Sequence, residues 1–75
     1  MPENLITVKS VVDSLEKERL IPIGYVSFRQ GYLQGKVNDK VKKYIVEIKK
    51  FTSTSYYLRE ADKEKFSDAL IKQFN

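Results

Sequence analysis

Basic and tyrosine side chains recur through the middle of the chain, and their chemistry suits the recognition of a polyanion. Residues 21–59 hold eight Lys and Arg against two Asp and Glu, a net charge of +6, whereas residues 1–20 and 60–75 each carry a net −1. Phosphate groups attract Lys and Arg whatever the base sequence, and aromatic rings on a sheet can stack on bases. This distribution of charge favours nucleic acid as a partner.

Eight of these side chains form the candidate binding surface. If the middle of the chain consists of strands, alternation of side chains would place them together on one polar face of a sheet. The predicted nucleic-acid-binding residues are Tyr25, Arg29, Tyr32, Lys36, Lys43, Lys49, Tyr57 and Arg59, and Lys40, Lys42 and Lys50 would extend the patch. A solvated sheet face without a binding role has the same pattern, because antiparallel sheets commonly expose one polar side.

Catalytic chemistry has little support in the residue types present. The chain has no His and no Cys, which removes the commonest general base, the commonest metal ligand and any thiolate. The hydroxyl run at residues 53–55 is typical of a turn, and Glu60, Asp62 and Glu64 are typical of the acidic start of a helix. We therefore expect no enzymatic activity, no specifically bound metal and no cofactor.

An amphipathic helix is predicted near the N-terminus. Apolar residues recur every three or four positions from Val8 to Leu15, and Thr7 is a good N-cap candidate. Pro22 disfavours helical conformation in the residue before it, so the helix should end near Arg19. These signals predict a helix over residues 7–19.

A second helix is predicted at the other end of the chain, with strands between the two. An apolar stripe from Phe66 to Phe74, with Asp62 as its cap, predicts a helix over residues 62–74. The segment between the helices is rich in β-branched and aromatic residues, with turn residues at intervals. The predicted strands cover residues 22–29, 32–37, 41–51 and 56–60.

These elements define an α+β fold for the chain, expected as a single domain over residues 1–75. We predict a three- to four-stranded antiparallel sheet with an N-terminal and a C-terminal helix packed on one face, in the order α-β-β-(β)-β-α. The apolar face of the sheet should include Val46 and Ile48, both nearly inaccessible beneath the helices. A one-residue slip would move them to the other face.

The predicted order of elements resembles that of two nucleic-acid-binding families. An α-β-β-β-α order resembles double-stranded-RNA-binding domains, which place lysines and small residues at the start of the last helix, where this chain has Asp62 to Phe66. A three-stranded sheet followed by a helix resembles, over residues 21–75, the N-terminal DNA-binding domains of some tyrosine recombinases. Residues 56–74 are similar to the end of bacterial pleckstrin-homology-like domains. These resemblances concern element order and define no family.

Two functions are open at this point. The first is a small intracellular nucleic-acid-binding protein that uses a basic, tyrosine-bearing sheet face. The alternative is a protein–protein interaction module, such as a regulator, an inhibitor or an oligomer-forming subunit, whose partner is a larger protein or a second copy in a homodimer; Tyr and Arg are enriched at such interfaces as well. The absence of Cys favours the cytoplasm. No membrane span and no signal peptide are expected, because no apolar run approaches ~20 residues.

Overall fold

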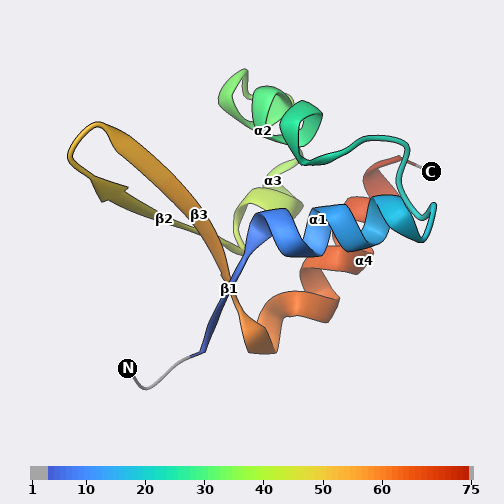
Figure 1. The fold of residues 1–75 in the computed structure, drawn as a ribbon. Helices are drawn as coiled ribbons and strands as arrows, with labels where there is room; N and C mark the ends of the chain where they lie inside the picture. Colours follow the sequence, from blue (N-terminus) through green and yellow to red (C-terminus); the bar gives the residue numbers. More distant parts are fainter. Residues whose placement is uncertain (1–3, 75) are drawn as a thin grey trace.

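A three-stranded antiparallel sheet is covered on one side by helices in the computed structural model, which describes residues 4–74 (Figure 1). The strand order is β1-β3-β2, so the last strand in the chain is the central one. This arrangement confirms the predicted α+β class and the antiparallel sheet with helices on one face. In chain order the elements are β1 (Leu5–Thr7), α1 (Val8–Lys17), α2 (Tyr25–Leu33), α3 (Asp39–Lys42), β2 (Ile45–Lys50), β3 (Ser53–Arg59), the 3-10 turn η1 (Glu60–Asp62) and α4 (Lys63–Gln73).

The first predicted helix is α1, and its two ends are set by local hydrogen bonds. The Thr7 hydroxyl accepts a hydrogen bond from the Ser10 N–H at 3.2 Å, which confirms the expected N-cap. Beyond the helix, Arg19 is in the left-handed region with φ of 60°. The N–H groups of Arg19 and Leu20 then donate to carbonyl groups of the last turn, which ends the helix as a left-handed residue commonly does.

Loss of the Thr7 hydroxyl should destabilise α1, because Ala offers no acceptor for the first free N–H groups of the helix. We expect Thr7→Ala to lower the free energy of unfolding by about 1 kcal/mol. The Thr7→Ser variant keeps an acceptor and should retain most of the wild-type stability. Urea denaturation of the three proteins measures the difference, and equal stability of all three would contradict the capping role.

The hydrophobic core lies where α1 and α4 pack over the centre of the sheet. Leu58 of β3 and Phe66 and Leu70 of α4 are fully buried, and they contact the valine stripe of α1. The rings of Phe28 and Phe66 meet edge to face with centroids 6.1 Å apart, which joins α2 to α4. The predicted C-terminal helix is therefore confirmed, and its apolar stripe is the one that the sequence indicated.

The two strands predicted over residues 22–29 and 32–37 are wrong, because α2 occupies this part of the chain. Gly35 lies just past the helix with φ of 74°, and the N–H of Lys36 donates to the Gly31 carbonyl at 2.8 Å. Glycine in this conformation commonly ends a helix. With a helix here, the element order no longer matches the orders on which the resemblances to the two nucleic-acid-binding families rested.

The sequence does contain a spacing of residues that indicates the helix α2. The prediction of strands followed instead from the many β-branched and aromatic residues in this segment. Tyr25, Phe28 and Tyr32 are spaced i, i+3 and i+7, which is one face of a helix. Phe28 is buried, and the two tyrosines pack partly buried against the core. Tertiary packing of this aromatic face thus overrides the local preference for strand.

The side-chain phase predicted for the third strand is also wrong. Ile45 pairs with the buried Leu58, whereas Val46 pairs with Tyr57 on the opposite face, so Val46 and Ile48 are only half-buried on the side away from the helices. In addition, a helical turn, α3, occupies the first residues of the strand predicted over 41–51. The strand consequently begins at Ile45, and apolar residues on both faces leave the phase undetermined by pattern alone.

Residues 4–74 contain no helix that is both long and apolar enough to cross a membrane.

Candidate nucleic-acid interface

The outer side of α2 exposes polar side chains that can form hydrogen bonds with the bases or the backbone of a nucleic acid. Ser27, Arg29 and Gln30 are exposed, while Phe28 anchors the helix in the core. Val26 and Leu33 lie among them with exposed fractions of 70% and 61%. The outer side of α2 therefore combines hydrogen-bonding groups with apolar contact area.

The hairpin of β2 and β3 stands beside α2 and projects away from the helices (Figure 1). Lys49 and Lys50 end β2, and a two-residue connection leads into β3. Both lysines are exposed, and neither forms an ion pair with a carboxylate of residues 4–74. Two uncompensated positive charges thus lie at the far end of the hairpin.

A shallow groove of about 280 Å³ joins α2 to this hairpin. Tyr25 and Arg29 of α2 line one side, and Thr54 and Tyr57 of β3 line the other. The groove forms here because β1 is short. Its last residue, Thr7, pairs with Tyr57, so the part of β3 before Tyr57 has no described strand neighbour on that side. The groove shows that the first turns of α2 and the outer half of the hairpin belong to one continuous surface.

Tyr32 fixes the position of α2 against the sheet. Its hydroxyl donates a hydrogen bond to Glu47 of β2, and its ring meets the Tyr56 ring edge to face with centroids 5.2 Å apart. Burial, followed by the hydrogen bond and the charge of Glu47, raises the pKa of Tyr32 to about 12. Burial also raises the pKa of Tyr25, against a smaller opposing effect of Arg29. Both rings hold α2 in place and are not free platforms for bases.

The raised pKa of Tyr32 predicts a loss of stability at high pH. In the unfolded chain the phenol ionises near pH 10, and in the folded protein near pH 12. The folded state therefore binds the proton more tightly, so this contribution is complete below pH 10 and is lost as the pH rises toward 12. We expect the difference in unfolding free energy between wild type and Tyr32→Phe to shrink over this range in urea titrations. A difference independent of pH would contradict the assignment.

The structure brings together only part of the predicted binding set. Tyr25, Arg29 and Tyr57 share the groove described above, and Tyr32 lies beside it against Tyr56. The single tyrosine-bearing sheet face is not formed, because the four residues predicted between Tyr25 and Lys36 lie on or just after a helix.

The other four basic residues of that set lie in different parts of the fold. Lys49 lies near the hairpin end, on the sheet face that carries Glu47 and Tyr56, and Lys36 is exposed just beyond α2. Arg59 ends β3 opposite Leu5 of β1, at the other end of the sheet. Lys43 follows α3, with its Nζ 5.0 Å from the centre of the Tyr44 ring. The expected contiguous patch of five positive residues is therefore wrong.

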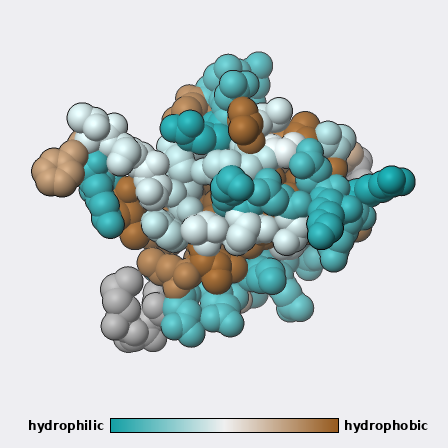
Figure 2. Space-filling view, viewed as in Figure 1, coloured by the Kyte–Doolittle hydropathy of each residue, from teal (hydrophilic) through white to brown (hydrophobic). Residues whose placement is uncertain are grey.

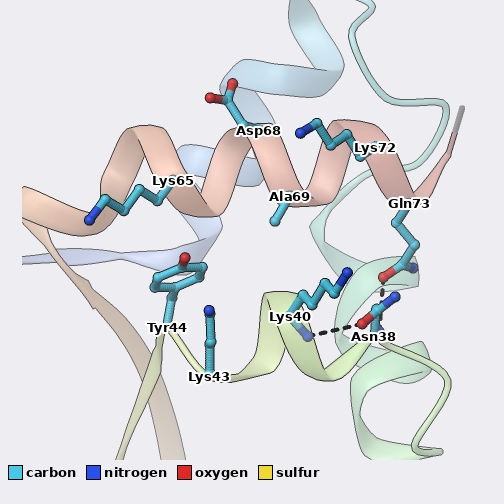
Figure 3. Close-up of a pocket in the computed structure, with 9 residues that line it drawn as sticks. All are labelled: Asn38, Lys40, Lys43, Tyr44, Lys65, Asp68, Ala69, Lys72 and Gln73. Atoms are coloured by element: carbon cyan, nitrogen blue, oxygen red, sulfur yellow. Dashed lines mark hydrogen bonds between the residues drawn. The ribbon is translucent and has the colours of Figure 1, made fainter.

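Lys43 belongs to a second positively charged surface, a groove of about 490 Å³ between α3 and α4. Lys40 and Lys43 rise from the side of α3 and Ala69 faces them from α4, while the backbone N–H of Asn38 donates to the Gln73 side chain at 2.9 Å and closes one end (Figure 3). Lys65 and Lys72 of α4 complete its four lysines. This α3–α4 groove is separate from the groove between α2 and the hairpin.

The polar residues on the outer side of α2 were missed by the sequence analysis, which assigned Ser27 to a strand and gave Gln30 no role. The aromatic spacing of Tyr25, Phe28 and Tyr32 would have identified the helix and hence its opposite, exposed side. Within residues 4–74 no cluster of three or more acidic residues is arranged to hold a metal ion.

Comparison of the chain with models of protein families, with curated proteins and with solved structures found no match.

Proposed function

We propose that this chain is a small intracellular DNA-binding protein that contacts duplex DNA with the outer side of α2 and with the β2–β3 hairpin. The observation that carries the proposal is the groove that joins the start of α2 to the hairpin, with Arg29 on one side and Thr54, the strand partner of Lys49, on the other. The major groove of B-DNA admits an α-helix or a two-stranded ribbon, and phosphates attract the flanking lysines.

The order of the helices supports this mode of binding. In helix-turn-helix proteins the first helix crosses the DNA backbone, and the N-terminal residues of the second contact base edges. Here α1 and α2 are the consecutive helices, although their connection spans residues 18–24 and is longer than the common turn of three or four residues. Base contacts would then come from the first turns of α2.

The exposed side chains of α2 have the chemistry that base recognition requires. Arg29 can donate two hydrogen bonds to guanine, Gln30 can pair with adenine, and the exposed Val26 can contact a thymine methyl group. The side-chain amino groups of Lys49 and Lys50 have no hydrogen-bonding partner among the described residues and suit phosphate oxygens, which position a protein without specifying sequence.

A salt titration of binding to a mixed-sequence duplex tests this function. Fluorescence anisotropy should detect binding at low salt, and the logarithm of the association constant should fall linearly with the logarithm of the salt concentration, by about 0.9 for each phosphate neutralised. The same experiment with single-stranded DNA and double-stranded RNA gives the preference among nucleic acids. Absence of duplex binding at low salt would contradict the proposal.

The second candidate function is docking onto a protein, and the exposed apolar residues of α2 favour it. Val26 and Leu33 are seven residues apart on one helix and largely exposed, as interface residues often are in the free protein. If they contact a second copy of the chain, the molar mass measured by light scattering should rise with concentration, and Leu33→Asp should abolish the rise. A monomer at all concentrations would exclude the homodimer.

A further inference from the structure

Phe51, at the end of the β2–β3 hairpin, is the most exposed apolar side chain among the described residues. Its exposed fraction is 110% of the reference value, and it is not among the residues that form or pack against the core. The outermost atoms of the hairpin are coloured as hydrophobic in the surface view (Figure 2). Single exposed apolar residues are common, so exposure alone implies nothing.

The backbone of Phe51 adds a second, independent observation. Its φ is 49°, in the left-handed region, and it is the first of the two residues that connect β2 to β3. Two-residue hairpin connections with positive φ favour Gly, Asn or Asp at this position, because a bulky side chain crowds the backbone. A large apolar residue therefore occupies a position where stability would favour a small or polar one, and strain of this kind often accompanies a functional role.

We propose that Phe51 is a wedge that inserts between neighbouring base pairs of the bound duplex from the minor groove. The proposal rests on the DNA-binding function proposed above and adds a mode of contact to it. Apolar side chains at the ends of minor-groove elements partly unstack a base step and kink the duplex.

The neighbours of Phe51 match the chemistry of such a site. Lys49 and Lys50 precede it, and Thr52 and Ser53 follow it, so in the sequence Phe51 is flanked on both sides by exposed residues that can bind phosphate oxygens. Thr54, three residues beyond Phe51, shares a groove with Arg29 of α2. With α2 in the major groove, the end of the hairpin would reach the neighbouring part of the same duplex.

The test uses duplexes that carry 2-aminopurine, a base whose fluorescence rises when it is unstacked, at T–A steps, which unstack most easily. Wild-type protein should raise the emission, and Phe51→Leu, which keeps an apolar side chain, should retain most of the increase. Phe51→Ala should abolish it and weaken binding by about 5- to 100-fold, the range found when an aromatic contact to a base is removed. The salt dependence should not change, because no charge is lost.

Stability provides the control for these variants, since Phe51 is fully exposed and is not among the described residues that form or pack against the core. Phe51→Gly takes up the left-handed conformation without crowding, so it should melt no lower than wild type while binding DNA as weakly as Phe51→Ala. Wild-type-like affinity of Phe51→Ala, with no change in emission, would overturn the wedge and leave DNA binding intact. Failure of the wild type to bind any duplex would overturn both, and binding to phosphatidylserine vesicles that depends on Phe51 without unstacking would overturn the wedge in favour of a membrane contact.

Discussion

Phe66→Ala should lower the free energy of unfolding by about 3–5 kcal/mol, the range found when a large buried aromatic residue is truncated. Phe66 is fully buried between the sheet and the helices, and its ring contacts Phe28 edge to face. Truncation removes apolar contacts and leaves a cavity at the point where α2 and α4 meet. A domain of this size has a total stability of roughly 4–11 kcal/mol, so the variant should be largely unfolded at a temperature that the wild type tolerates.

The matched control for this prediction is the same truncation at an exposed phenylalanine. Phe51→Ala removes the same atoms from a side chain that has no part in the core, so its unfolding free energy should stay within about 0.5 kcal/mol of wild type. Urea unfolding followed by circular dichroism measures both variants. A loss of unfolding free energy for Phe66→Ala as small as that for Phe51→Ala would contradict the place of Phe66 in the core.

The double variant Lys49→Gln/Lys50→Gln should bind duplex DNA about 10- to 100-fold more weakly than wild type near 0.1 M salt, because two phosphate contacts and their released counterions are lost. The salt dependence should also become shallower, by about one for each lysine. Gln keeps the approximate length and polarity of Lys, so the fold should be unaffected. Anisotropy titrations at several salt concentrations measure both effects.

A double substitution in the α3–α4 groove distinguishes two causes of weaker DNA binding: the loss of contacts made by the hairpin lysines and the lower net charge of the protein. Lys40→Gln/Lys65→Gln removes the same two charges and lowers the net charge from +4 to +2, as the hairpin variant does. If the hairpin binds the duplex, this control should lose much less affinity. Equal losses in the two variants would show attraction by the whole protein and would exclude a specific role for the hairpin.

The two terminal helices could be predicted from sequence because each has a long apolar stripe, although the Asp62 side chain makes no capping hydrogen bond at the start of α4. Thr7 caps α1 as expected, and Phe66 and Leu70 of α4 lie in the core. The short strand β1 could not be predicted, because three residues carry no usable periodicity and form a strand only by pairing with β3. The same dependence on distant pairing explains why the phase of β2 was missed.

The candidate site was harder to predict than the fold, because its residues come together only after α2 is recognised as a helix. Arg29 and Tyr25 were identified from composition, yet on a strand they would face the wrong neighbours. Lys43 is close in sequence to Lys49, but the α3 turn directs it to the groove beside α4. The basic residues can be identified from the sequence alone. To predict which of them lie together in space, the secondary structure must be correct.

The most direct test of DNA binding by α2 and the hairpin is to map the contact surface by NMR, using ¹⁵N-labelled protein and an unlabelled mixed-sequence duplex. We predict that the largest amide shifts occur at residues 25–34 and 48–54, that the α3–α4 groove changes little, and that the shifts reverse on addition of salt. Shifts concentrated around Lys65 and Lys72, or no shifts at low salt, would contradict the proposed interface.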